Sequence, residues 1–149
     1  MKSPYIPLAE QLDFRSYRLA LLLVREINRA LEPFGLTQEK WQVLAALWEA
    51  GASISQTRVA ELTFKDKPSI SRLASALVKT GWVTRINDKT DGRAYLLKAS
   101  AKADAKRQEI IEAIAAQFRP YHLKLGESSR TQLRTLLGMY ISILETRCE

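Results

Sequence analysis

Apolar residues recur at three- and four-residue steps over most of the chain, which is the period of helices that bury one face. The first such stretch covers residues 10–31 and ends before a proline and a glycine. A second helix is expected at residues 38–50, with Thr37 as its N-cap and Gly51 as its C-terminal stop. The first third of the chain therefore predicts two amphipathic helices.

Two further helices, separated by a turn, are predicted in the centre of the chain. The first is short and extends from its cap residue Ser55 to Leu62, and residues 63–66 form the turn. The second covers residues 67–80 and has a proline in its first turn, where a missing N–H costs little. Its apolar side chains match the amphipathic template throughout: Ile70, Leu73, Ala74, Leu77 and Val78. This order is typical of a helix-turn-helix.

A β-hairpin is predicted directly after these helices. Residues 82–86 and 93–98 are prone to form strands, and the polar segment between them is rich in turn-forming residues. The helical period returns at Ser100, and we expect Pro120 to break or kink that helix. Residues 126–129 are expected to form a turn with an available cap before the last helix.

These elements predict a mainly α fold with a small β-wing. Residues 37–99 would form a winged helix-turn-helix, flanked by helices in residues 1–36 and 100–149. The outer helices are about 20 residues long, and a chain of this size cannot easily bury both of their ends on itself. Two copies could bury them together, so we expect a homodimer joined by these helices.

The positive charge of the chain is concentrated in its centre. The 149 residues carry a formal net charge of +7. Residues 58–107 contain 12 of the 23 Lys and Arg residues and 5 of the 16 Asp and Glu residues, so this segment accounts for the whole excess. A concentrated basic region is the footprint of a phosphate-binding surface, although a solvated charged face has the same composition.

The helix at residues 67–80 places hydroxyl and basic side chains opposite its apolar stripe. Small hydroxyls let a helix approach the major groove, and Arg72 can make a forked contact with guanine or phosphate. The hairpin adds Arg93, which a wing can insert into a narrow minor groove, with Asp91 able to hold it by an ion pair. Either part alone also fits an ordinary charged surface, but their succession favours DNA. The expected DNA contacts are Lys65, Lys67, Pro68, Ser69, Ser71, Arg72, Ser75, Lys79, Arg85, Lys89 and Arg93.

Several segments at fixed spacings resemble the MarR family of bacterial winged-helix transcription regulators, and the likeness covers nearly the whole chain. The segments are residues 31–37 with Trp41, 59–62, 69–73, 81–85, and 91–94, the last being similar to the Asp-x-Arg wing motif of the family. The chain departs from the family at residues 99–103, where the family usually has Leu-Thr-x-x-Gly, and at residues 63–66, where the turn is bulkier and more charged than usual.

The resemblance implies an obligate homodimer that binds a roughly palindromic DNA operator, usually to repress transcription. It also implies release of DNA when a small, often aromatic molecule enters a crevice between the dimerisation and DNA-binding parts. Candidate residues for that crevice are Phe14, Tyr17, Trp41 and Trp48, although side chains at helical spacing are more often core or dimer contacts.

Other chemistries find little support in the sequence. His122 is the only histidine and Cys148 the only cysteine, so we expect no metal site, no internal disulfide and no cofactor. No nucleophile has a plausible base, so an enzyme is not expected. We expect a cytoplasmic protein, nucleoid-associated when bound, because there is no apolar run of about 20 residues and no secretory signal pattern. Two alternatives stay open: a winged helix that contacts RNA or protein, and a helical protein that binds small molecules without DNA.

Overall fold

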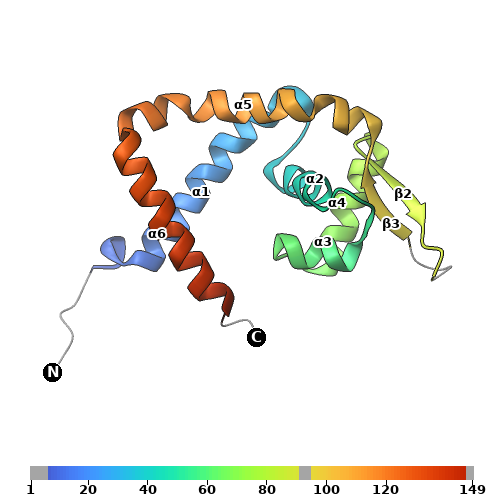
Figure 1. Cartoon of the computed structure of the whole chain (residues 1–149), viewed down its shortest axis with the longest axis horizontal. Coiled ribbons are helices and arrows are strands. Elements are labelled where there is room, and N and C mark those ends of the chain that lie inside the picture. The colour runs from blue at the N-terminus through green and yellow to red at the C-terminus, as the bar shows by residue number, and fades with distance from the viewer. Residues whose placement is uncertain (1–6, 91–94, 147–149) are drawn as a thin grey trace. The chain divides into compact units, whose positions relative to one another are not determined.

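The computed structural model describes residues 7–90 and 95–146, which are mostly helical with one small antiparallel sheet (Figure 1). This architecture confirms the predicted fold class. In chain order the elements are the 3₁₀ helix η1 (Leu8–Glu10), α1 (Leu12–Leu31), η2 (Glu32–Phe34), α2 (Gln38–Ala50), β1 (Ile54–Ser55), α3 (Gln56–Thr63), α4 (Lys67–Lys79), β2 (Val83–Asn87), β3 (Tyr95–Ala99), α5 (Ala101–Leu125) and α6 (Glu127–Glu145).

Contacts divide the chain into two units, and the boundary lies inside α5, after Ile114. The first unit contains α1 to α4, the sheet and the first part of α5, and the second contains the remainder of α5 and α6. The boundaries predicted at residues 36/37 and 99/100 do not coincide with the boundary between these two units. They divide the chain by role, into dimerisation helices and a DNA-binding part, and those roles stay predictions. Within the described residues, no helix is both long enough and apolar enough to cross a membrane.

The core of the first unit lies where α2, α3 and α4 pack on one another and on the sheet (Figure 1). Three residues of the predicted stripe in α4, Ile70, Ala74 and Leu77, are fully buried there. The other fully buried side chains of the described residues come from six elements: Leu31, Val43, Leu44, Val59, Val83, Leu97, Ala103 and Ile110. Because one face of α4 is committed to this core, its opposite face must point to solvent.

Side-chain caps begin the helices of the winged domain. The Thr37 hydroxyl accepts from the Lys40 N–H at 3.4 Å, and Ser55 accepts from the Arg58 N–H at 3.1 Å, which confirms both predicted caps. Ser100 accepts from the Ala103 N–H at 3.1 Å and therefore begins α5 despite the departure from the family pattern. Each cap satisfies a backbone donor that has no partner within its own helix.

The sheet has the strand order β1-β3-β2, and both pairings are antiparallel. Leu97 is the partner of Ile54 on one side and of Arg85 on the other, and Asn87 is the partner of Tyr95. The predicted hairpin is confirmed in β2 and β3, whereas residues 91–94 lie outside the described residues. The strand β1 was not predicted from the sequence, because two residues are too few to show the two-residue alternation of strands.

The helix ends differ from three expectations. The first long helix begins at Leu12, two residues after the expected start, because η1 precedes it. Pro120 does not break α5, which continues to Leu125, since a proline removes only one of the helical hydrogen bonds, and a kink at Pro120 stays a prediction. Residues 126–129 do not form a capped turn. Gly126, with φ of 80°, is the one residue between α5 and α6, and α6 begins at the next residue without a side-chain cap.

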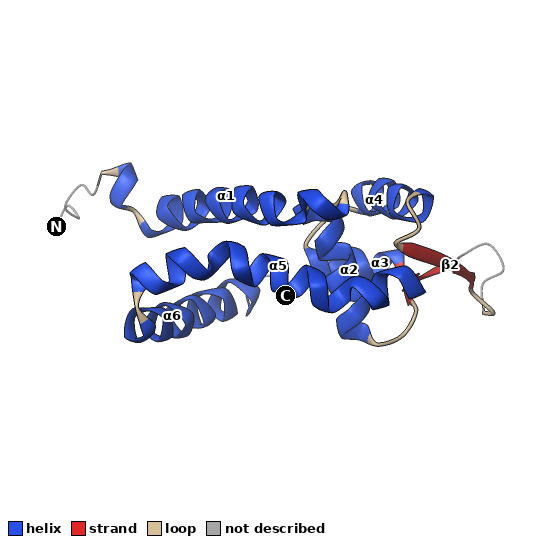
Figure 2. Cartoon of the chain, turned by 90° about the horizontal axis from the view of Figure 1, so that it is seen from above, coloured by secondary structure: helices blue, strands red, loops and turns tan. Residues whose placement is uncertain are grey.

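Each unit exposes large apolar side chains on its long helices. In the first unit α1 extends beyond the winged domain (Figure 2), and it exposes Leu12, Phe14, Tyr17, Leu21, Leu22 and Leu23. In the second unit the exposed set is Tyr121, Leu123, Leu125, Leu133, Leu136, Met139, Ile141, Ile143 and Leu144. Exposed apolar faces of this extent are typical of surfaces for association.

Candidate nucleic-acid interface

The polar face of α4 gathers most of the predicted DNA contacts. Ser69 is half-buried, and the other six predicted residues of this helix are exposed: Lys67, Pro68, Ser71, Arg72, Ser75 and Lys79. The buried stripe fixes the orientation of α4 on the domain, so the hydroxyl and cationic groups of its other face lie on the outside. We call this surface, together with the turn before α4 and the β2–β3 hairpin beside it, the reading face.

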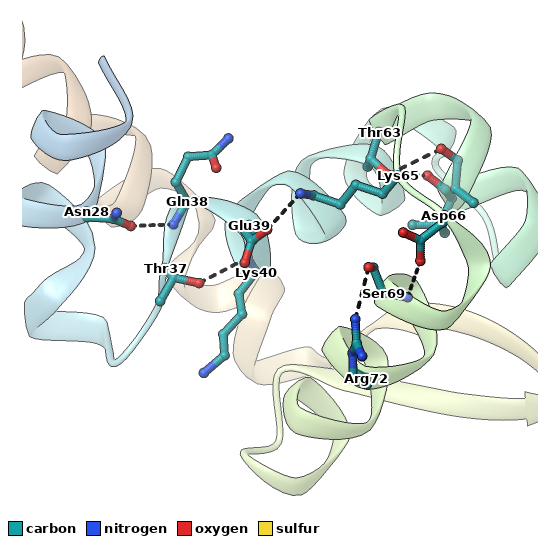
Figure 3. Close-up of polar contacts among 12 residues, drawn as sticks. Asn28, Thr37, Gln38, Glu39, Lys40, Thr63, Lys65, Asp66, Ser69 and Arg72 are labelled. Atoms are coloured by element: carbon teal, nitrogen blue, oxygen red, sulfur yellow. Dashed lines mark hydrogen bonds and ion pairs between the residues drawn. The ribbon is translucent and has the colours of Figure 1, made fainter. Parts of the chain in front are cut away.

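The N-terminus of α4 is capped by Asp66, which the sequence analysis had placed only in the turn. Its Oδ1 accepts from the Ser69 N–H at 2.7 Å (Figure 3). This hydrogen bond is the main cause that holds the pKa of Asp66 below its ordinary value, and the Arg72 guanidinium adds to it. Arg72 Nη2 also donates to Ser69 Oγ at 3.2 Å, so the Arg72 side chain lies along the first turn of α4.

Arg85 connects the hairpin to α4. Its Nη2 donates to Ser75 Oγ at 2.7 Å, and its guanidinium lies 4.4 Å from the centroid of the Tyr95 ring. Two predicted DNA contacts, Arg85 and Ser75, are therefore joined by a hydrogen bond where β2 packs beside α4. Tyr95 was not among the site residues predicted from the sequence, although it lies on the paired strand two residues from Leu97, the partner of Arg85.

The turn between α3 and α4 exposes one aromatic residue and covers one lysine. Phe64 has φ of 53° and is 78% exposed. The next residue, Lys65, forms an ion pair with Glu39 of α2, with 2.8 Å between Nζ and Oε1 (Figure 3). Glu39, Ser69 and Arg72 line a common hollow of about 210 Å³. Nothing local distinguishes Glu39 in the sequence, because its partner lies 26 residues away.

The described part of the hairpin tip contains Lys89, which is exposed as predicted. The neighbouring Thr90 donates to Asp88 Oδ1 from its N–H at 2.9 Å and from its hydroxyl at 2.6 Å, which closes a local turn. Arg93 and Asp91 lie outside the described residues. The contact of Arg93 with a minor groove therefore stays a prediction.

The candidate effector residues separate into two groups. Trp41 and Trp48 line one hollow of about 160 Å³ with Ala45, Glu49, Arg107 and Ile111. Trp48 Nε1 donates to Asp104 Oδ1 at 3.0 Å, and the Arg107 guanidinium lies 5.5 Å from a Trp48 ring centroid. Phe14 and Tyr17 are exposed on α1 and are not among the residues that line this hollow. An effector role for any of the four stays a prediction.

A small sheet beside a helix-turn-helix defines a winged-helix domain, and comparisons with known proteins agree. The MarR family sequence model matches residues 34–94. The uncharacterized HTH-type transcriptional regulator YwoH of Bacillus subtilis is 32% identical over 91 residues, which is 61% of this chain and 65% of that protein. The transcriptional activatory protein BadR of Rhodopseudomonas palustris is 27% identical over 142 residues, which is 93% of this chain and 79% of that protein.

A solved structure extends the likeness to most of the chain. The crystal structure of CouR from Rhodococcus jostii RHA1 bound to p-coumaroyl-CoA aligns with a TM-score of 0.74 and 25% identity, covering 91% of this chain and 93% of that one. The sequence match, the regulators and this structure together show that the chain is similar to proteins of the MarR family. The match with YwoH spans just under two thirds of that relative.

Proposed function

We propose that the protein is a sequence-specific regulator of transcription that inserts α4 into the major groove of duplex DNA. The exposed hydroxyl and cationic face of α4 carries this proposal, because the opposite face is fixed in the core. The major groove admits an α-helix and displays a different pattern of hydrogen-bonding groups for each base pair. The relatives support the proposal because they are transcription regulators.

The proposed contacts divide into those that position the protein and those that read sequence. Lys67 and Lys79 would neutralise phosphates at the two ends of α4, while Arg72 would contact a guanine edge or a phosphate. Ser69, Ser71 and Ser75 would bond to phosphates or bases, and Pro68 would pack closely against the groove. Arg85, Lys89 and Arg93 would act from the hairpin, with Arg93 in the minor groove.

We further propose a homodimer that occupies a pseudo-palindromic operator. The apolar side chains exposed on α1, and those exposed on α5 and α6, support this because a second copy would cover them. A symmetric pair would present its two α4 helices to half-sites about 34–36 Å apart, which is one turn of DNA. A protein in this role would lie in the cytoplasm, with the nucleoid.

We also propose that the regulator represses transcription and releases DNA when a small aromatic molecule binds at Trp41 and Trp48. The cationic Arg107 beside these rings and the acyl-CoA ligand of CouR support an anionic aromatic molecule. BadR is named an activator, so a reporter gene under the recovered operator must decide the direction of control.

Selection of bound sequences from a random duplex pool tests the DNA proposal. We expect one recovered motif with two half-sites one helical turn apart. Arg72→Ala and Arg93→Ala should each lose binding to this motif while sedimentation still shows a dimer. Arg119→Ala removes an exposed arginine from α5 and serves as the matched control.

Three outcomes would contradict parts of the proposal. Failure to enrich any motif would refute sequence-specific DNA binding. Equal competition by duplex RNA would favour the RNA alternative, because a steep dependence on salt is common to both nucleic acids. A monomer in sedimentation would refute the dimer.

A further inference from the structure

The position of the Lys65 ammonium is determined by the fold around it. The Lys65 N–H bonds to the Ala60 carbonyl at 3.1 Å and closes the end of α3, while the next residue, Asp66, caps α4. The backbone is therefore held on both sides of Lys65. Its side chain is only 20% exposed, so the aliphatic stem is largely covered on the way to Glu39.

Glu39 brings a negative charge to the reading face. Its side chain is 59% exposed in the first turn of α2, and it lines the hollow that also contains Ser69 and Arg72 (Figure 3). A carboxylate without its lysine partner would repel DNA phosphates here, because the exposed Glu39 side chain would lie close to bound DNA and both groups are negative. The ion pair with Lys65 makes the local charge zero.

We propose that Glu39 keeps Lys65 from contacting DNA and thereby limits the affinity of the protein for duplex of any sequence. The inference rests on the proposed DNA-binding function and differs from the sequence-based expectation that Lys65 contacts DNA. Moving the ammonium from Glu39 to a phosphate would uncover the stem and leave the carboxylate unpaired beside the polyanion. The pair therefore persists in the complex, and the turn adds no phosphate contact.

Each phosphate contact contributes to binding without regard to sequence and releases condensed counterions. A withheld contact lowers the affinity for cognate and unrelated duplexes by the same factor. It also makes the slope of log K, the logarithm of the association constant, against the logarithm of the salt concentration shallower by about 0.9 for each withheld contact. Removing the Glu39 charge should therefore strengthen DNA binding, whereas removing one of the cations around it should weaken binding.

Three variants of the full chain test this inference: Glu39→Gln, Lys65→Met and the double variant. Dissociation constants are measured between 50 and 200 mM salt on the selected operator and on a scrambled duplex. Glu39→Gln should bind both duplexes several-fold more tightly and steepen the salt slope by about 0.9. Lys65→Met should weaken binding because it leaves the carboxylate bare. The double variant should return to the affinity and slope of the original protein.

Glu109→Gln is the matched control, because Glu109 is also an exposed glutamate paired with a lysine, Lys106 on α5. It should leave the salt slope unchanged, and an equal steepening by this variant would overturn the inference. Thermal melting of every variant checks that folding is intact.

Two further results would overturn the inference. If Lys65 already contacts a phosphate, the double variant will have a slope about 0.9 shallower than the original protein. If Glu39→Gln leaves the slope unchanged, no contact was withheld. If the original protein binds the operator and one of these two results is found, the inference about Glu39 is overturned while the proposed DNA-binding function stands. If the original protein binds neither duplex, the proposed function fails and the inference fails with it.

Discussion

Phe64 combines an unfavourable backbone conformation with an exposed side chain. Its φ of 53° and ψ of 35° are left-handed, and among the described residues it is the one non-glycine residue with positive φ. Its N–H bonds to the carbonyls of Ala60 and Glu61, which ends α3 in the way that glycine usually ends helices. Replacing Phe64 by glycine should relieve the strain and keep this helix end.

Comparison of Phe64→Gly with Phe64→Ala isolates the backbone contribution. Both lose the small part of the ring that is covered, because the side chain is 78% exposed. That part is worth about 0.3–0.7 kcal/mol if full burial is worth about 1.5–3 kcal/mol. Only glycine escapes the left-handed cost of about 1–2 kcal/mol. Compared with alanine, glycine also raises the conformational entropy of the unfolded chain, which lowers the free energy of unfolding by about 0.4–1 kcal/mol.

Phe64→Gly should therefore be more stable than Phe64→Ala by about 1 kcal/mol. Inside a helix the order is reversed, so Ala105→Gly, at an exposed position of α5, should cost about 0.5–1 kcal/mol. Gly51 has φ of 63° and nothing within 4 Å of an added Cβ, so Gly51→Ala should cost about 1 kcal/mol from conformation alone.

The free energies of unfolding come from urea titrations followed by tryptophan fluorescence. All variants are compared at one protein concentration, because association shifts the apparent stability. If Phe64→Gly is less stable than Phe64→Ala, backbone strain is not the dominant effect at this turn and the reasoning is refuted.

Three other predictions concern the core, the helix cap and the proposed dimer. Leu77→Ala should cost about 2–5 kcal/mol in urea unfolding because the side chain is fully buried in α4, and a cost below about 1 kcal/mol would contradict this. Asp66→Ala should lower stability at neutral pH. The pKa of Asp66 is lowered by folding, so its contribution is present above the ordinary carboxyl pKa and lost as pH falls through the lowered value. The stability difference between the two proteins should thus shrink on acidification, and a constant difference would refute it. Leu22→Glu, at an exposed apolar position of α1, should shift sedimentation toward monomer, whereas Ala20→Glu, an exposed position on another side of the helix, should shift it less; equal dimerisation of both would place the interface elsewhere.

Local patterns in the sequence were sufficient to predict most of the helices. The spacing of Ile70, Ala74 and Leu77 predicted the buried side of α4, and Thr37 and Ser55 predicted two helix starts. These predictions hold because helical periodicity and capping depend on residues only three or four positions apart. Elements without such a pattern were missed, as β1 was, and the helix break considered at Pro120 does not occur.

The sequence by itself determined which residues face outward on the reading face, whereas only the tertiary structure decided how those residues pair. Lys65 and Glu39 are 26 positions apart, and Trp48 and Asp104 are 56 positions apart. Arg85 reaches Ser75 only because β2 packs beside α4. Such contacts follow from the packing of separate elements in the core, and the period of one helix contains no information about its neighbours. For this reason the sequence placed Lys65 among the cations that contact DNA, and the fold placed it against a carboxylate.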